Sequence, residues 1–221
     1  MGTIKIRNYP EEIQVGKIIC VGRNYPAHVK EMKNPIPEKP VLFIKPSSAI
    51  AKENDHIVIP PISKEAHYEA ELIAVIGKTG KKIDAGNAYS HVLGYGIGLD
   101  MTLRDIQNQA KSKGLPWSIA KGFDTSAPVS EIITGIADPS DLRIKCTVNG
   151  ELRQDSPTRE MIFPVDKIIE FASSIFTLER GDIIFTGTPD GVGPVKDGDL
   201  ITAELDGYVK ITFKVRFDAC C

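Results

Sequence analysis

The chain has 221 residues, of which 42% are hydrophobic and 25% are charged, a composition typical of a globular protein with one sizeable core. It contains no run of about 18 apolar residues that could span a membrane, and its first residues lack the apolar core of a signal peptide. The formal net charge of -2 comes from intermixed acids and bases, without the basic stripe that nucleic-acid binding requires. We therefore expect a cytoplasmic protein whose partner is a small molecule, with no nucleic acid and no membrane.

The chain opens with residues 1–16, which predict an N-terminal extension, and continues with Lys17–Val21, a β-branched apolar run that predicts a buried strand. Pro26 predicts the start of a short helix that reaches Met32, because proline is favoured in the first helical turn. Three prolines soon follow and forbid a longer helix. We predict that residues 26–38 form a lid that closes when the site is occupied.

Two polar residues of this short helix, His28 and Glu31, are three positions apart and therefore share a face. A carboxylate beside an imidazole holds one tautomer and raises the basicity of the outward nitrogen, as in a general base. A surface histidine with an ion-pair neighbour has the same spacing. The pair is therefore a candidate for catalysis.

The next predicted strand covers residues 41–45 and is stopped by Pro46. Lys45 at its end has two interpretations, a substrate contact or an edge lysine that blocks strand pairing. Its position alone does not decide between them.

Residues 67–76 predict one extended strand, in which residues two apart lie on the same face. His67, Glu69 and Glu71 then share a face that becomes apolar further along. Two like charges beside a segment that favours burial repel each other and lose hydration unless a cation lies between them. A solvated strand end is the ordinary explanation of an isolated Glu-x-Glu, so further ligands must decide.

Another strand is predicted over residues 94–100, with three alternate glycines and Asp100 on one face. Missing side chains allow close approach, either by a ligand or by another backbone segment. The run is not a dinucleotide-binding fingerprint, because Leu99 occupies the position of the third glycine.

A helix is predicted from Thr102, whose hydroxyl would cap the first turn, to Gly114. Arg104 and Gln107 emerge from its first turns, just beyond Asp100. A guanidinium there could hold a substrate carboxylate with two parallel hydrogen bonds.

The last third of the chain predicts mostly scaffold, with hairpins that turn at Asn149-Gly150 and Asp206-Gly207 and a helix opened by Pro164. The loop 187–193 could present amides and the Thr188 hydroxyl to an anion, or could be a tight turn. Strands outnumber helices, which predicts one α+β domain built round a curved or barrel-like sheet. Four cysteines, without zinc-site or disulfide spacing, receive no chemistry: Cys20, Cys146, Cys220 and Cys221.

Glu69, Glu71 and Asp100 together offer three carboxylates from two strand ends, with no cluster of histidine or cysteine to compete. All-oxygen, trianionic ligation suits Mg²⁺ or Mn²⁺ rather than zinc and leaves about half of an octahedral shell open. His67 could be a fourth ligand, although a position beside the ligands is the more usual role for such a histidine.

Several motifs occur in a fixed order between about Lys17 and Lys214: Gly22-Arg-Asn-Tyr25 with His28 and Glu31, Phe43-Ile-Lys-Pro46, His67-Tyr-Glu-Ala-Glu-Leu72, Leu99-Asp-Met-Thr-x-Arg104-Asp105, Gly114-Leu-Pro-Trp117 with Ala120-Lys121, and Thr186-Gly-Thr-Pro-x-Gly-Val-Gly-Pro194. Together they resemble the fumarylacetoacetate hydrolase family. The short length is most similar to its acylpyruvase and oxaloacetate decarboxylase subgroup.

The resemblance implies a fumarylacetoacetase-like mixed β-sheet rolled into a partly open barrel with a few short helices, one catalytic domain over residues 1–221, and a homodimer. It implies Mg²⁺ or Mn²⁺ as cofactor on Glu69, Glu71 and Asp100. It also implies a set of catalytic residues, namely His28, Glu31 and Lys121, and a set of substrate-binding residues, namely Arg23, Arg104, Gln107 and Thr188.

We therefore expect a metal-dependent enzyme that acts on small 2-oxo acids through a pyruvate enolate, hydrolysing acylpyruvates, decarboxylating oxaloacetate, or both. The enzymatic alternatives are an oxaloacetate keto-enol tautomerase and an isomerase or decarboxylase of aromatic-ring catabolism. The non-enzymatic alternative is a metal-dependent ligand-binding protein. Such a protein could dispense with His28, Glu31 and Lys121, all of which are present.

Overall fold

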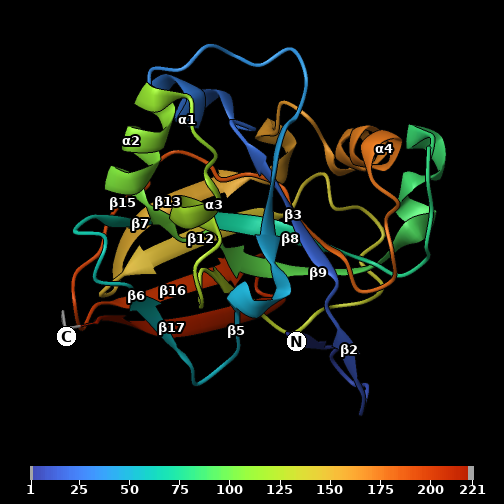
Figure 1. Cartoon of the computed structure of the whole chain (residues 1–221). Helices are drawn as coiled ribbons and strands as arrows, with labels where there is room; N and C mark the ends of the chain where they lie inside the picture. Colours follow the sequence, from blue (N-terminus) through green and yellow to red (C-terminus); the bar gives the residue numbers. More distant parts are fainter. Residues whose placement is uncertain (1, 219–221) are drawn as a thin grey trace.

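The computed structural model describes residues 2–218 as two five-stranded sheets packed against each other (Figure 1). The first sheet has the order β4-β3-β14-β8-β9, with bounds Val41–Pro46, Lys17–Gly22, Ile183–Phe185, Ala70–Ile76 and Val92–Leu99. The second has the order β13-β12-β16-β17-β6, with bounds Glu151–Pro157, Arg143–Val148, Leu200–Leu205, Val209–Phe217 and His56–Ile59. Each sheet combines parallel and antiparallel pairs. The predicted α+β class with a partly open, mixed-sheet barrel is confirmed.

Strand β8 is the central element because both of its faces are buried. On one face Leu72, Ala74 and Ile76 pack into the core shared with the second sheet. On the other, Ile73 and Val75 belong to a separate core with β3 and β14. A strand buried on both faces has a nearly continuous apolar sequence, which is what residues 72–76 show.

The helices are short: α1 Pro26–Glu31, α2 Arg104–Lys113, α3 Ser118–Lys121 and α4 Val165–Ile175, with 3₁₀ turns at Ser47–Ala49, Ala85–His91 and Thr158–Glu160. Helices α1 and α2 lie at the upper left of Figure 1 and α4 at the upper right. Gly114 ends α2 in the left-handed conformation (φ 64°), as predicted from its position. Over residues 2–218 no helix has the length and apolar character to cross a membrane.

Three small sheets complete the fold, and one of them corrects a prediction. They pair β1 Thr3–Lys5 with β2 Glu12–Gln14, β5 Ile50–Ala51 with β11 Ala127–Pro128, and β7 Ala66–Tyr68 with β10 Thr102–Leu103 and β15 Gly193–Pro194. The single strand predicted over 67–76 is therefore divided at Glu69, since β7 and β8 pair with different neighbours. The division makes Glu69 the junction between two sheets.

The predicted start of a helix at Thr102 is also wrong. Thr102 pairs with His67 in β10, so its backbone is extended and α2 begins at Arg104 without a side-chain cap. The Thr102 hydroxyl instead donates to the carbonyl of Asp100 at 3.3 Å. Strand pairing to a distant segment has replaced the local capping interaction.

The glycines of β9 are explained by packing within the protein. A Cβ added at Gly94 would lie 2.4 Å from the carbonyl oxygen of Ile133, and one at Gly98 would lie 2.6 Å from the ring of Phe185. The close approach left open by the sequence is therefore made by neighbouring segments. The predicted hairpin turns are confirmed, since Asn149 and Gly150 both have positive φ, 52° and 83°.

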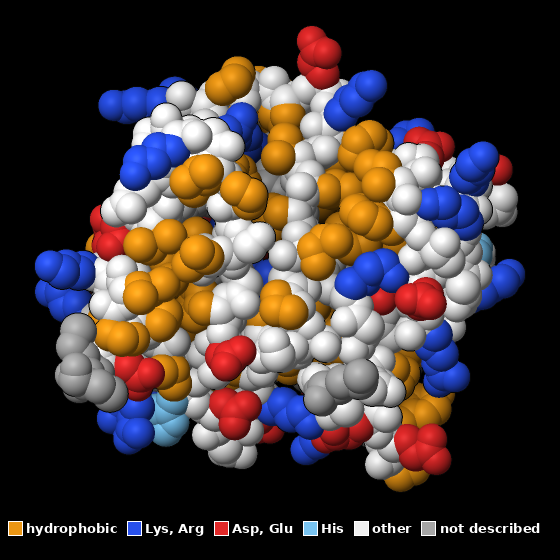
Figure 2. All heavy atoms as spheres, in the orientation of Figure 1, with side chains coloured by type: hydrophobic (Ala, Val, Ile, Leu, Met, Phe, Trp, Pro, Cys, Tyr) orange, Lys and Arg blue, Asp and Glu red, His pale blue; other side chains and the backbone are white. Residues whose placement is uncertain are grey.

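One face of the molecule is notably apolar. Figure 2 shows hydrophobic side chains gathered over the face viewed in Figure 1, with lysine and arginine side chains around its margin. Large apolar patches of this kind are typical of interaction surfaces. The homodimer expected from the resemblance stays a prediction, which sedimentation of the protein would test.

Candidate active site

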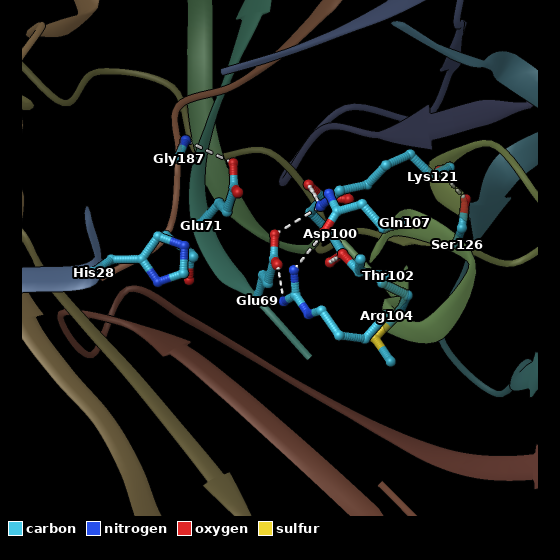
Figure 3. Close-up of polar contacts among 12 residues, drawn as sticks. His28, Glu69, Glu71, Asp100, Thr102, Arg104, Gln107, Lys121, Ser126 and Gly187 are labelled. Atoms are coloured by element: carbon cyan, nitrogen blue, oxygen red, sulfur yellow. Dashed lines mark hydrogen bonds and ion pairs between the residues drawn. The ribbon is translucent and has the colours of Figure 1, made fainter. Parts of the chain in front are cut away.

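Three carboxylates meet where β8 and β9 lie side by side. The antiparallel register pairs Glu71 with Gly98 and Ala70 with Leu99, so Glu69 and Asp100 follow at the same end of the sheet. One oxygen from each of Glu69, Glu71 and Asp100 lies within 4.8 Å of the others, and all three residues are buried. Figure 3 shows them converging on one point.

Lysine and arginine side chains neutralise two of these carboxylates. The ammonium of Lys121 donates to Oε2 of Glu69 at 2.7 Å and to Oδ2 of Asp100 at 2.6 Å. Arg104 binds Oε1 of Glu69 at 2.5 Å, and Lys45 lies 2.8 Å from Oδ1 of Asp100. Burial opposes ionisation of Glu69, but the charges of Lys121 and Arg104 outweigh burial and hold its pKa well below the ordinary value. A cation thus already lies between two of the three carboxylates.

Glu71 has a different environment. It accepts a hydrogen bond from the amide of Gly187 at 2.6 Å and forms no ion pair with a described residue. Burial, followed by the negative charges of Asp100 and Glu69, raises its pKa well above the ordinary value. A carboxyl that holds a proton because it is buried beside like charges is prepared to exchange that proton for a metal ion. The donor set therefore fits a hard divalent cation such as Mg²⁺ or Mn²⁺.

This arrangement predicts that metal stabilises the protein more as pH rises. Above the ordinary carboxyl pKa of 4.5 the unfolded chain ionises Glu71, while the folded, metal-free protein keeps it protonated and loses stability. Bound Mn²⁺ favours the ionised form and removes that loss. The melting temperature with Mn²⁺ minus that with EDTA should increase from pH 5 to pH 8, by the order of a few degrees. An increment that is the same at both pH values would contradict the assignment of Glu71.

His28 of α1 lies on the opposite side of the cavity from Lys121 (Figure 3). Nδ1 of His28 is 3.2 Å from Oε2 of Glu31, so the two side chains form the pair that their spacing predicts. Oε1 of Glu31 also accepts a hydrogen bond from the amide of Gly191 at 3.1 Å. The short helix is thereby attached to the loop that follows β14.

The candidate substrate-binding residues lie together, but several are engaged by the protein itself. Arg104 donates to Oε1 of Gln107 at 2.7 Å as well as to Glu69. The Thr188 hydroxyl donates to the carbonyl of Ala70 at 2.9 Å, so its one proton is used by the scaffold. All four candidates, Arg23, Arg104, Gln107 and Thr188, line the same cavity as the carboxylates.

Gln154 is a site-supporting residue that the sequence does not reveal. Its Oε1 accepts a hydrogen bond from the amide of Ala70 at 3.0 Å, and its Nε2 donates to the Thr188 hydroxyl at 2.8 Å. Gln154 and Thr188 therefore bind both polar groups of Ala70, the residue between Glu69 and Glu71. The only signal for this role is a buried polar residue at an inward position of β13.

Lys45 matches neither of its two predicted roles, a substrate contact or an edge lysine that blocks strand pairing. It is fully buried, pairs with Asp100, and donates to the carbonyl oxygens of Met101 and Ser126 at 3.2 and 3.0 Å. It therefore supports Asp100 from behind the cavity. His67, the possible fourth ligand, instead places Nε2 2.9 Å from Oε1 of Glu65 and lies outside the carboxylate cluster.

The cavity in this conformation holds about 40 Å³, enough for roughly one water molecule. Lys121 and residues His28 and Met32 at and beside α1 are among the residues that line it. A larger cavity of about 670 Å³ lies near β1 and the turn between β16 and β17, far in sequence from the carboxylates, and its charged lining is mixed in sign. The chemistry is therefore placed in the smaller cavity, which must widen to admit a substrate.

Known proteins share this fold and sequence. The family model described as Fumarylacetoacetate (FAA) hydrolase C-terminal matches residues 17–216. The Homo sapiens protein named mitochondrial oxaloacetate tautomerase FAHD1 is 50% identical over 201 residues, which cover 90% of this chain and 91% of the relative. Since that name places the relative in mitochondria, a cytoplasmic location for this chain stays a prediction.

Two solved structures extend the likeness to three dimensions. Fumarylpyruvate hydrolase from Pseudomonas aeruginosa, in complex with Mn²⁺ and pyruvate, has a TM-score of 0.94 and 37% identity, with 98% of this chain and 96% of that chain covered. The 5-carboxymethyl-2-hydroxymuconate delta-isomerase of Mycobacterium smegmatis has a TM-score of 0.85 and 40% identity, with 95% and 82% covered. A hydrolase and an isomerase therefore share this scaffold.

Proposed function

The chain belongs to the fumarylacetoacetate hydrolase family, a family of enzymes, and we propose that it interconverts the keto and enol forms of oxaloacetate through an enolate. One observation carries the proposal. The buried carboxylates and the imidazole of His28 line the same cavity from opposite sides. A substrate held between them would meet a cation site on one side and a base on the other. The names of the tautomerase relatives supply oxaloacetate as the substrate.

In this proposal Glu69, Glu71 and Asp100 hold Mg²⁺ or Mn²⁺. The bound ion supplies a Lewis acid that stabilises negative charge on the 2-oxo oxygen. Lys121 bridges Glu69 and Asp100 in this structure, so its ammonium would be released from at least one of them and become available to the substrate. Its pKa supports a permanent charge. Burial opposes the charge, but Asp100 and Glu69 outweigh burial and raise the pKa of Lys121.

His28 would move the proton. Because Nδ1 faces Glu31, the carboxylate holds the proton on Nδ1 and leaves Nε2 free to accept one from carbon 3 of oxaloacetate. The electrons of that carbon–hydrogen bond form the double bond of the enolate, and Nε2 then gives the same proton to the enolate oxygen, which completes the enol. The reverse sequence returns the keto form. Tautomerisation therefore needs one base and no water.

The lid would keep water away from the enolate. Glu31 links α1 to the loop 187–193, whose first amide also binds Glu71. Closure of the lid and binding at the carboxylates are thereby connected through one loop. Arg104, held by Glu69 and Gln107, would face the carboxylate next to the 2-oxo group.

Hydrolysis of acylpyruvates is a second candidate, favoured by the likeness to a fumarylpyruvate hydrolase. The same His28 and Glu31 would then remove a proton from water, which attacks the distal carbonyl and releases a carboxylic acid and pyruvate. Decarboxylation of oxaloacetate would yield the same enolate of pyruvate. The three reactions differ in the group that leaves carbon 3, which is a proton in tautomerisation, the acyl group in hydrolysis and carbon dioxide in decarboxylation.

Purified protein incubated with Mg²⁺, Mn²⁺ or EDTA tests the proposal. We expect metal-dependent loss of the enol absorbance of oxaloacetate, faster than pyruvate appears from either oxaloacetate or acetylpyruvate. Faster release of pyruvate from acetylpyruvate would make hydrolysis the main reaction. No turnover of any substrate, with or without metal, would favour a ligand-binding protein.

A further inference from the structure

Two cationic side chains of the cavity form no ion pair with a residue that the structure describes. Four cationic side chains line it, and two of them, Arg104 and Lys121, are bound to the carboxylates. The side chains of Arg23 and Lys111 make no hydrogen bond or ion pair with any residue between 2 and 218. Cations that line a cavity without a partner are positioned for an anion from outside the protein.

Lys111 is held in position by its surroundings. It follows Arg104 and Gln107 on the same face of α2, because residues seven, four and three apart align along a helix. Its Nζ lies 5.4 Å from the centre of the Trp117 ring, within the range of a cation–π contact. Burial, followed by the charges of Arg104 and Arg23, lowers the pKa of Lys111. All three side chains line the same cavity.

Arg23 approaches from the other wall. It stands between β3 and α1 with the left-handed φ of 62°, a conformation that is uncommon outside glycine. Its side chain lines the cavity from this segment. Arg23 therefore belongs to the entrance of the lid and Lys111 to the helix opposite.

The charge of the cavity favours a substrate with more than one anionic group. Four cationic side chains face three carboxylates, so a bound divalent ion leaves an excess of positive charge. The carboxylate beside the 2-oxo group does not neutralise that excess. A second carboxylate on the same substrate would reduce it further.

We propose that Lys111 and Arg23 form a subsite for the distal carboxylate of the substrate, so that the enzyme selects 2-oxo dicarboxylates over 2-oxo monocarboxylates. The subsite rests on the proposed function, because it assumes that the 2-oxo end occupies the carboxylate site. Lys111 has no role in the proposed metal chemistry, and the subsite gives it one.

The test replaces Lys111 with methionine, which keeps the length of the side chain and removes its charge. Lys113→Met is the matched control, since Lys113 is exposed on the same helix and lies outside the cavity lining. With Mn²⁺ present, kcat/KM for oxaloacetate should fall about tenfold in Lys111→Met, mainly through KM, the amount expected for one hydrogen bond to a charged group. For acetylpyruvate, a monocarboxylate, the fall should stay within about threefold.

A binding measurement separates failure of the subsite from failure of the proposed function. Calorimetry on the Mn²⁺-loaded protein compares 2-oxoglutarate with 2-oxopentanoate, which differ only in that a methyl replaces the distal carboxylate. Lys111→Met should weaken binding of 2-oxoglutarate about tenfold and largely remove its advantage over 2-oxopentanoate. Equal weakening of both ligands, or none, overturns the subsite even if oxaloacetate is turned over. Selective weakening without any turnover leaves the subsite standing and removes the proposed reaction.

Discussion

Glu71→Gln should abolish turnover of every 2-oxo acid while the metal-free protein remains folded and at least as stable as the parent near neutral pH. The amide has the size of the carboxyl and cannot ionise, so it resembles the protonated Glu71 that burial, Asp100 and Glu69 favour through a raised pKa. It cannot supply the third negative charge to a divalent ion. Loss of Lewis-acid stabilisation, worth several kcal/mol, should lower kcat by at least about a thousandfold.

Three measurements on one preparation check this result: turnover with saturating Mn²⁺, Mn²⁺ affinity by electron paramagnetic resonance, and melting temperature in EDTA. Asp100→Asn is the informative comparison. Asp100 neutralises Lys45 and Lys121, and removing one partner of a buried ion pair costs about 3–5 kcal/mol. That variant should therefore lose stability as well as turnover. A Glu71→Gln protein that binds Mn²⁺ as tightly as the parent would exclude Glu71 as a ligand.

The local parts of this structure follow from local sequence. The turn at Asn149-Gly150 requires two residues with positive φ, and Asn-Gly tolerates them, so the hairpin is predictable from two letters. The short helix α1 is bounded by Pro26 and by the prolines beyond it. Gly114 ends α2 because glycine readily adopts the left-handed conformation found there. None of these depends on a distant residue.

The carboxylate site could be predicted only in part. Alternation along a strand places Glu69 and Glu71 near each other, but the division of that strand at Glu69 depends on pairing with β10 and β15. Gln154 supports the site through a residue 84 positions away in the sequence. Lys45 is 56 positions from the carbonyl of Met101 that it binds. Interactions over such separations leave no periodic signal, so composition and spacing could not reveal them.

The three glycines of β9 also show what the sequence alone cannot predict. The sequence indicates that something approaches the strand closely, and the structure identifies segment 130–133, Phe185 and Ile73 as what approaches. Lys121 is the opposite example, a residue at the centre of the site whose sequence gave no signal. Its spacing carries no information, yet it is placed at the centre of the site because the chain after Trp117 turns through α3 and directs it at Glu69 and Asp100.

The lid histidine should separate the reactions that share the enolate. His28→Gln keeps a polar side chain in the cavity but removes the base, and general-base catalysis contributes about 10²–10⁴-fold. Hydrolysis of acetylpyruvate and tautomerisation of oxaloacetate both need a proton moved by His28, so both should fall by about that factor. Decarboxylation of oxaloacetate loses carbon dioxide and needs no proton abstraction, so it should fall by less than about tenfold.

Glu31→Gln distinguishes catalysis by the pair from a merely structural lid. Glutamine keeps one acceptor oxygen, which can still take the hydrogen bond from the amide of Gly191, so the lid should remain attached. Its amide group then offers Nδ1 of His28 a donor in place of a carboxylate oxygen, so the charge that holds the proton on Nδ1 is gone. Tautomerisation should then fall by an intermediate factor, about tenfold to a hundredfold, with decarboxylation again less affected. Equal losses in all three reactions would mean that α1 only covers the site. Hydrolysis and tautomerisation that survive His28→Gln would remove the base from the mechanism and leave enolate stabilisation at the carboxylate site as the whole of the catalysis.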